Sequence, residues 1–348
     1  MRRHWPEYER QFGAELLPSH RRAVECILSC RTRALGGQLF RCSPCALDHY
    51  VYHSCNHRAC PQCGAADATD WIEQRKLKLL PVPYYLITFT VPAGLRAWLR
   101  SHQKLGYARL LRESAGALQD VARHEKYLGG ELGFLSVLHT WGRQLQFHPH
   151  VHVVVPAGGL RADGLRWVRP KSPDFFLPYR VLAARFRNRL RDGLRAEHPE
   201  EFRPIPAAVW RQAWVVHVQP AGGGEGALKY LSAYVYRTAL GNHRIVADEN
   251  GQVTFRYQDS ENNQWHKLTL PALEFLRRFL QHILPPGFQR VRYYGWLSAA
   301  ATAKWERIVA LLDWAEPAPT PPASKAPPVC PHCGGPLYLV GRLARAPP

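Results

Sequence analysis

The spacing of apolar residues predicts a chain of alternating strands and helices after its first sixty residues. Runs rich in β-branched and aromatic residues predict strands at 84–91, 134–141, 148–156 and 210–218. Apolar residues at helical spacing predict helices at about 67–80, 93–127, 176–196, 228–238, 271–284 and 298–313. Three further short runs, 244–246, 253–257 and 265–270, predict an antiparallel meander with one turn at 249–251.

Cysteine and proline divide the chain into four parts. Residues 1–79 combine a short helical lead-in with most of the cysteines, and Pro81-Val82-Pro83 ends this part because proline opposes continuation of a helix. Residues 80–314 contain most of the predicted strands and helices. A proline-rich linker follows at 315–328, and a tail at 329–348 carries a last CxxC pair.

Composition and charge point to a polyanionic partner. The 348 residues include 46 Lys and Arg against 27 Asp and Glu, a formal charge of +19. A hydrophobic content of 46% excludes broad disorder. No apolar run approaches the ~20 residues that cross a bilayer, and no secretory signal opens the chain. We therefore expect a cytoplasmic protein without a membrane partner.

The cysteines predict zinc. Cys42-x2-Cys45 and Cys60-x2-Cys63 are two CxxC pairs with fourteen residues between them, a spacing typical of a tetrahedral zinc site. Cys55 and His57 lie inside this interval and are either ligands of a second site or loop residues. The last pair, Cys330 and Cys333, lacks a matching pair nearby. It completes a site with Cys26 and Cys30, pairs with another chain, or carries no metal.

The segment His148-Pro149-His150-Val151-His152 predicts a second kind of metal site. In a strand, His150 and His152 project from the same face while Val151 turns to the core. Two such imidazoles can hold one divalent ion, although two core histidines would show the same pattern. His139, on the preceding strand, is the favoured third ligand because a hairpin places it beside the pair. His148 and, more remotely, Gln144 are rivals.

The helix expected at 228–238 carries tyrosines at helical spacing. Tyr230 and Tyr234 are four residues apart and share one face, with Lys229 and Arg237 close enough to stabilise a phosphate charge. A phenol becomes a useful nucleophile where a metal ion polarises its target. An amphipathic helix that buries two aromatic rings is the alternative interpretation.

The order of these motifs resembles a known family. A cysteine-rich N-terminus, HPHxHxxVP at 148–156, YLxxYxYR at 230–237, EFLRRF at 274–279 and RYYG at 292–295 follow one another. The chain resembles the rolling-circle transposases of the IS91 class, which are two-tyrosine HUH enzymes with an N-terminal zinc-binding domain. It departs from the usual family pattern at Ala59, where a histidine is common, and at Ala233, where a basic residue is common.

The resemblance implies an α+β fold with a central antiparallel HUH-type (ferredoxin- or RRM-like) sheet, flanking helices and a small N-terminal zinc-binding domain. Residues 1–79 would recognise DNA and 80–314 would be catalytic. His150 and His152, with His139 by analogy, would bind Mg²⁺ or Mn²⁺. Tyr230 or Tyr234 would attack single-stranded DNA, at transposon ends and target, to give a 5′-phosphotyrosine and a free 3′-OH. Zn²⁺ would be structural, and no nucleotide cofactor is expected.

Two other functions fit parts of the pattern. A rolling-circle replication initiator or relaxase shares the chemistry, although the chain has no GxxxxGK[ST] loop and so no evident helicase domain. A non-catalytic, zinc-dependent DNA-binding protein explains the charge and the cysteines, and it treats the histidines and tyrosines as core residues. Substitutions in those residues would then change stability without selectively removing DNA cleavage.

Overall fold

The chain folds into two compact units, each assembled from segments distant in sequence. The computed structural model describes residues 1–63, 65–172, 175–235, 239–259, 262–318 and 328–345. The first unit contains Met1–Asp67, Tyr236–Ile283 and Ala318–Pro348. The second contains Ala68–Val235 and Leu284–Pro317.

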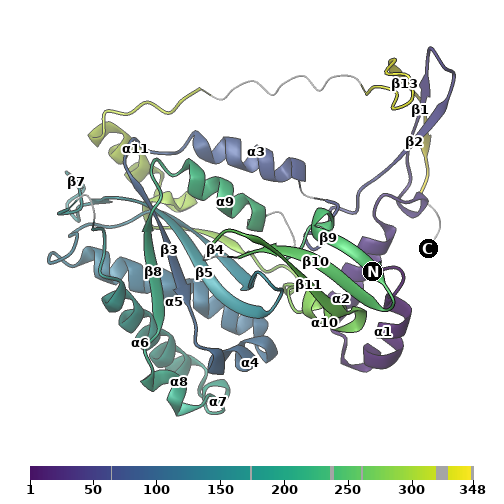
Figure 1. The fold of residues 1–348 in the computed structure, drawn as a ribbon. Coiled ribbons are helices and arrows are strands. Elements are labelled where there is room, and N and C mark those ends of the chain that lie inside the picture. Colours follow the sequence, from purple (N-terminus) through teal and green to yellow (C-terminus); the bar gives the residue numbers. More distant parts are fainter. Residues whose placement is uncertain (64, 173–174, 236–238, 260–261, 319–327, 346–348) are drawn as a thin grey trace. The chain divides into compact units, whose positions relative to one another are not determined.

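A five-stranded antiparallel sheet forms the centre of the second unit (Figure 1). Its strand order is β12-β4-β5-β3-β8. The strands are β3 (Tyr84–Thr90), β4 (Phe134–Trp141), β5 (Phe147–Pro156), β8 (Val215–Pro220) and β12 (Val291–Tyr294). Strand β5 lies between β4 and β3, so its backbone groups are paired on both sides. This sheet with its flanking helices confirms the predicted α+β fold class.

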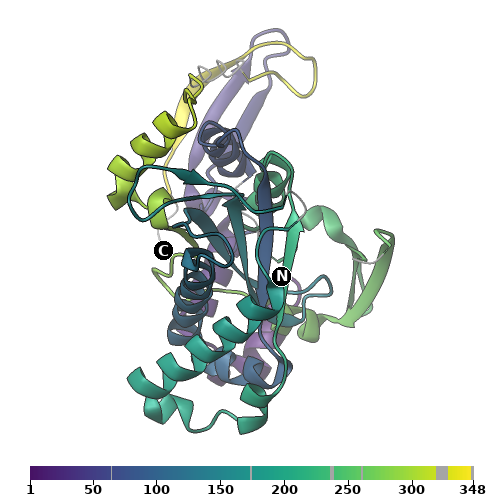
Figure 2. The same cartoon turned by 90° about the vertical axis from the view of Figure 1, so that its left-hand side faces the viewer.

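Helices cover both faces of this sheet. The helices of the unit are α3 (Ala65–Lys76), α4 (Ala93–Ser101), α5 (Gln103–Arg123), α6 (Tyr179–Glu197), α7 (Pro199–Phe202), α8 (Ala207–Arg211), α9 (Glu225–Val235) and α11 (Thr302–Leu311). Figure 2 shows the long helices α5 and α6 running beside each other on one face. Val151, Val153 and Val155 of β5 are completely buried on that face and share its core with α5 and α6. The alternate residues of β5 therefore point to the opposite face, where α9 packs.

The described residues of the first unit form two small sheets and three helices. The helices are α1 (Trp5–Phe12), α2 (Pro18–Ser29) and α10 (Ala272–Leu280). One sheet has the order β13-β1-β2, with β1 (Gly37–Cys42), β2 (Asp48–Tyr52) and β13 (Leu337–Leu343). The other is the expected meander of β9 (Ile245–Glu249), β10 (Gln252–Gln258) and β11 (Trp265–Pro271). Its first turn has Asn250 and Gly251 at φ 50° and 73°, as a tight hairpin between twisted strands requires.

The boundaries of these units differ from the four parts expected along the sequence. Residues 236–283 join the N-terminal segment, where Asp248 of β9 forms a 2.6 Å hydrogen bond with Nε2 of His4. The C-terminal tail joins it too, because β13 pairs with β1 in antiparallel register. Contacts between distant segments therefore shape the first unit, and linear composition does not reveal them.

The prediction of a strand at 210–218 was wrong over the first half of that range. Residues 210–218 were expected to form one strand, but α8 ends at Arg211 and β8 begins only at Val215. Trp210 is buried in that helix and stacks on Phe202 and Trp214 at ring-centroid distances of 5.7 Å. Burial of this ring thus outweighs the β propensity of the segment.

Strands β6 (Gly159–Leu160) and β7 (Trp167–Val168) form a minor hairpin in the second unit. Across the described ranges, no helix combines the length and the apolar character needed to cross a membrane.

Candidate active site and cysteine clusters

Three histidines meet on the face of the central sheet that α9 covers. His139 of β4 lies directly opposite His150 of β5, and His152 follows one pleat further along β5. All three side chains are buried, at 3%, 7% and 5% exposure. The alternation of side chains along β5 places His150 and His152 on this face, and the β4–β5 pairing brings His139 to them.

The facing nitrogens of the triad are close together. Nδ1 of His139 is 2.9 Å from Nε2 of His150, which is 3.1 Å from Nε2 of His152. Nitrogens at right angles around an octahedral ion, each about 2.1 Å from it, are about 3.0 Å apart. The triad therefore has the donor type and spacing that fit one divalent ion with octahedral preference. It leaves other coordination positions for ligands from elsewhere.

Hydrogen bonds and burial keep these imidazoles ready to donate lone pairs. Nδ1–H of His150 donates to the carbonyl oxygen of His148 at 2.6 Å, so Nε2 of the neutral ring carries its lone pair toward the triad. Burial lowers the pKa of His150 to about 4 and that of His152 far below its usual value. Nδ1 of His152 contacts Oγ1 of Thr88 at 2.9 Å, which fixes its ring in turn.

Tyr230 stands over the triad. Its ring lies 5.5 Å from that of His152, centroid to centroid and perpendicular to it, and the residue is 39% exposed. Helix α9 orients it by burying Leu228 and Leu231. Lys229 on the same helix is exposed. Tyr234 lies in the last turn of α9, but its side chain and all of Arg237 are outside the described residues.

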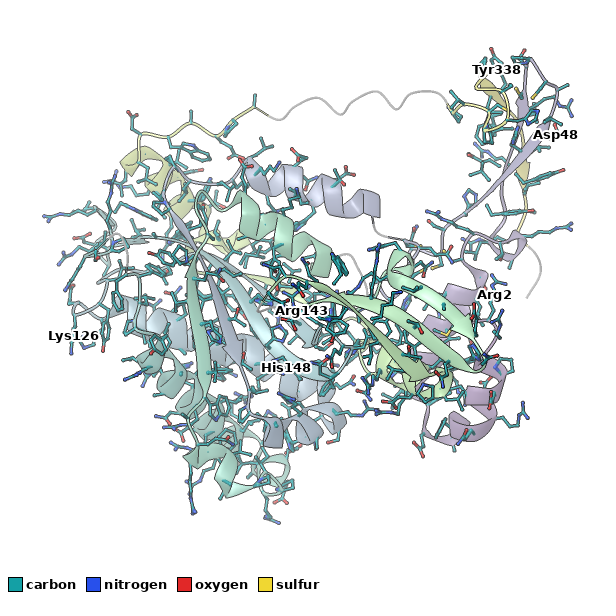
Figure 3. All side chains as sticks on the ribbon, viewed as in Figure 1. Arg2, Asp48, Lys126, Arg143, His148 and Tyr338 are labelled. Atoms are coloured by element: carbon teal, nitrogen blue, oxygen red, sulfur yellow. The ribbon has the colours of Figure 1, made fainter. Side chains whose placement is uncertain are left out.

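The rival ligands do not join the triad. His148 is not grouped with the three histidines, although its ring packs 5.1 Å from that of His150. Figure 3 labels His148 and Arg143 near this end of β5. Gln144 is exposed in the turn that follows β4, where its backbone N–H donates to Oε1 of Gln146.

Arg96 of α4 is a cation that the sequence did not single out. Together with burial, which is the larger effect, its charge lowers the pKa of His148 and of His150. Its Nε is buried without a hydrogen-bond partner among the described residues. No motif marks this arginine, because only the fold brings α4 to the histidine end of β5.

The first unit contains two clusters of four thiols. One consists of Cys30, Cys55, Cys60 and Cys63, and the other of Cys42, Cys45, Cys330 and Cys333. Sulfur–sulfur distances between partners are 3.3–3.7 Å in the first cluster and 3.4–3.8 Å in the second. Four thiolates at about 2.3 Å around zinc are about 3.8 Å apart, whereas a disulfide needs about 2.0 Å. Both clusters thus fit one zinc ion each.

This arrangement corrects the expected pairing of the two CxxC motifs. Cys42 and Cys45 do not share a site with Cys60 and Cys63, because β1 and β2 separate the two pairs. The C-terminal pair supplies the missing half of one cluster through the β1–β13 pairing, and Cys30 with Cys55 supplies that of the other. His57 is not in a cluster, and its Nδ1 accepts a hydrogen bond from the backbone N–H of Ala59.

One histidine that no sequence motif marks contacts the second cluster. Nε2 of His49 on β2 lies 3.2 Å from the sulfur of Cys330. Burial opposes ionisation of the Cys330 thiol, but hydrogen bonds from the backbone N–H groups of Cys333 and His332 and from the neighbouring thiols together lower its pKa to about 6. The pattern of sequence spacing contains no signal for His49.

Comparison with known proteins agrees with this architecture. Residues 1–91 match the family model of the transposase zinc-binding domain, Zn_Tnp_IS91. Residues 133–304, which include the histidine triad and α9, match the family model Y2_Tnp, described as "Putative transposase". These matches assign the chain to a class of DNA-processing enzymes.

Two relatives extend the likeness over most of the chain. The "Putative transposase y4qJ" of Sinorhizobium fredii is 38% identical over 91% of this chain and 84% of its own length. The transposase for insertion sequence element IS801 of Pseudomonas savastanoi pv. phaseolicola is 30% identical over 87% of this chain and 77% of its own. The chain therefore belongs to the IS91 family of transposases.

A solved structure of the conjugative relaxase TrwC in complex with oriT DNA is also similar. The identity is 13% and the TM-score 0.27, over 67% of this chain and 73% of that chain.

Proposed function

We propose that this transposase cleaves and joins single-stranded DNA through a covalent tyrosine intermediate. The observation that carries the proposal is the position of Tyr230, whose ring lies 5.5 Å from that of His152. A phenol and three clustered imidazoles on one sheet face suit metal-assisted phosphoryl transfer. His139, His150 and His152 would hold Mg²⁺ or Mn²⁺. A divalent ion bound there would supply positive charge that offsets the charge developing on the scissile phosphate.

The chain's own groups carry out the bond changes. The phenol oxygen of Tyr230 or Tyr234 forms a bond to phosphorus while the bond from phosphorus to the 3′ oxygen breaks. The phenol proton leaves to solvent, and the departing oxygen takes up a proton to become a free 3′-OH. One phosphate ester replaces another, so the later joining step needs no nucleotide cofactor. A second tyrosine allows a second cleavage while the first still holds DNA.

Basic residues provide affinity for the substrate. The chain carries a formal charge of +19, and Lys229 is exposed beside Tyr230 on α9. Lys229 and Arg237 are the residues that we expect to contact DNA phosphates near the nucleophiles. Binding through phosphate contacts releases counterions and so weakens steeply with salt. The zinc-bearing first unit would recognise the ends of the mobile element.

Formation of a covalent adduct tests the proposal. The protein is incubated with Mn²⁺ and single-stranded oligonucleotides that tile the DNA on both sides of its coding sequence. A protein–DNA adduct that resists denaturation should form, and Tyr230→Phe with Tyr234→Phe together should abolish it. Tyr179→Phe is the matched control, because Tyr179 is an exposed tyrosine of the same unit, at 51% exposure, outside the triad.

The role of the histidines is tested in the same assay. His150→Ala with His152→Ala should remove cleavage while the protein keeps much of its affinity for DNA. If adduct yield is unchanged in EDTA, no divalent ion takes part in the reaction. The histidine and tyrosine variants could instead be less stable than the wild type and yet, when folded, still cleave DNA. These side chains would then have a structural role and no catalytic role.

A further inference from the structure

A second recessed site lies on the same sheet face as the histidine triad. It is a cavity of about 340 Å³, enclosed by the end of α3, by β4, β5, α9 and β12, and by α11. Val154 of β5 and Leu135 of β4 form its floor, and they pair with each other across the sheet. Its size is that of the smaller ligand pockets of proteins, which accommodate a small organic group and exclude a duplex.

The cavity adjoins the triad directly. Val154 follows His152 by two residues and so points from the same face of β5, about 7 Å further along the strand. Leu228, also in the lining, lies on α9, the helix that carries Tyr230. A nucleotide that neighbours the phosphate at the triad is therefore within reach of the cavity.

The chemistry of the lining combines cations with aromatic rings. The guanidinium carbon of Arg75 lies 5.0 Å from the ring centroid of Tyr293, and Nζ of Lys78 lies 5.9 Å from that of Trp305. Nε of Arg75 is buried without a hydrogen-bond partner among the described residues. Such a donor favours an acceptor brought by a ligand. No acidic side chain occurs in the described lining.

We propose that this cavity, lined by Arg75, Lys78, Tyr293 and Trp305, binds an unpaired nucleotide of the DNA strand next to the scissile phosphate. The inference rests on the proposed function, because it takes single-stranded DNA as the substrate. Ring faces stack bases irrespective of sequence, and the two cations complement the phosphates on either side. A protein partner would need apolar or acidic groups of its own, and it would leave the proximity to the triad unexplained.

Binding to two probes of equal charge tests the proposal. One is a single-stranded oligothymidine and the other an abasic oligomer of the same length, which has the same phosphates but no bases. The full-length Tyr230→Phe, Tyr234→Phe protein is used, so that binding is measured without cleavage. We expect the oligothymidine to bind more tightly by about tenfold or more, since each stacked base contributes about 1–3 kcal/mol.

Substitutions separate stacking from charge. Trp305→Ala should lower the preference for oligothymidine several-fold and leave the affinity for the abasic oligomer unchanged. Lys78→Ala should lower the affinity for both probes equally and reduce the dependence of that affinity on salt concentration. The matched controls are Trp265→Ala, which removes an exposed tryptophan beside Arg256 in the first unit, and Lys126→Ala, which removes a lysine beside Tyr127. Both controls should retain the wild-type preference for bases.

The alternatives give different results. If Trp305→Ala keeps the wild-type preference between the two probes, the proposal is wrong. Because Trp305 also packs on Trp296, Trp305→Phe is measured alongside, and it should retain part of the preference. If Trp305→Ala does not fold, Arg75→Gln with Tyr293→Leu takes its place and should cause the same loss. If the adduct forms but the protein shows no preference for bases, nucleotide binding in this cavity is refuted and the proposed chemistry stands. If the protein prefers bases but forms no adduct, the proposed chemistry is refuted and nucleotide binding in the cavity stands.

Discussion

The sharing of one cysteine cluster between the two ends of the chain leads to a quantitative prediction. We expect the purified protein to hold two zinc ions, and Cys330→Ser with Cys333→Ser to reduce the content to one. In that cluster, Cys42 and Cys333 have sulfurs 3.4 Å apart, and Cys45 has its sulfur 3.8 Å from that of Cys330. Removing two of four thiolates forfeits most of the ~10–16 kcal/mol with which structural zinc binds at neutral pH.

The assay is the molar zinc content of the full-length chain after dialysis, measured by elemental analysis. Cys26→Ser is the matched control, because Cys26 is a free thiol in neither cluster, and it should leave two ions in place. Cys60→Ser with Cys63→Ser should also leave one ion, now in the cluster that contains Cys330.

A different zinc count would refute the grouping of the thiols. If the two CxxC pairs near the N-terminus shared one ion, the protein would hold a single zinc and Cys330→Ser with Cys333→Ser would retain it. Release of all zinc by Cys42→Ser with Cys45→Ser would contradict two independent clusters in the same way.

Three further predictions concern the histidine site. His139→Ala should reduce Mn²⁺-dependent cleavage far more than His148→Ala, because only His139 has a ring nitrogen within the triad; equal effects in the adduct assay would contradict this. Without divalent ions, the free energy of unfolding should fall as pH drops from about 6.5 toward 4. In this range the unfolded chain binds protons at His150 and His152, whereas the buried imidazoles of the folded chain do not. For His150, with its pKa lowered to about 4, the loss approaches about 3 kcal/mol. The free energy of unfolding, measured with denaturant, should depend less on pH for the His150→Gln, His152→Gln protein than for the wild type. Arg96→Gln should raise the pKa of His148, which NMR titration can measure.

The sequence predicts best those elements whose pattern is local. The strands with Phe134–Trp141 and Phe147–Pro156 follow directly from β-branched runs, and their alternation places His150 and His152 on one face. The third histidine also follows, because a short connection between two strands favours a hairpin. Local periodicity is sufficient in these cases, because neighbouring residues determine both the type of element and the face on which each side chain lies.

What the sequence does not predict depends on contacts between distant segments. The short strand Val291–Tyr294 adds to the sheet through pairing with β4, and its four residues are fewer than those of the runs that predict the other strands of this sheet. Gly295 ends that strand at φ 58°, where a Cβ would collide with the carbonyl oxygen of Leu132. The partner of the C-terminal CxxC is equally non-local, since about 290 residues separate Cys42 from Cys333. Arg96 and His49 reach their sites only through the fold.

In the proposed reaction, a tyrosine of α9 becomes joined to DNA beside the histidine triad. The most direct measurement is mass spectrometry of the adduct after digestion by protease and nuclease. We predict a nucleotide linked through a 5′ phosphate to Tyr230 or Tyr234, with formation dependent on Mg²⁺ or Mn²⁺. A linkage to any other residue, or an undiminished yield from the Tyr230→Phe, Tyr234→Phe protein, would show that these tyrosines are not the nucleophiles.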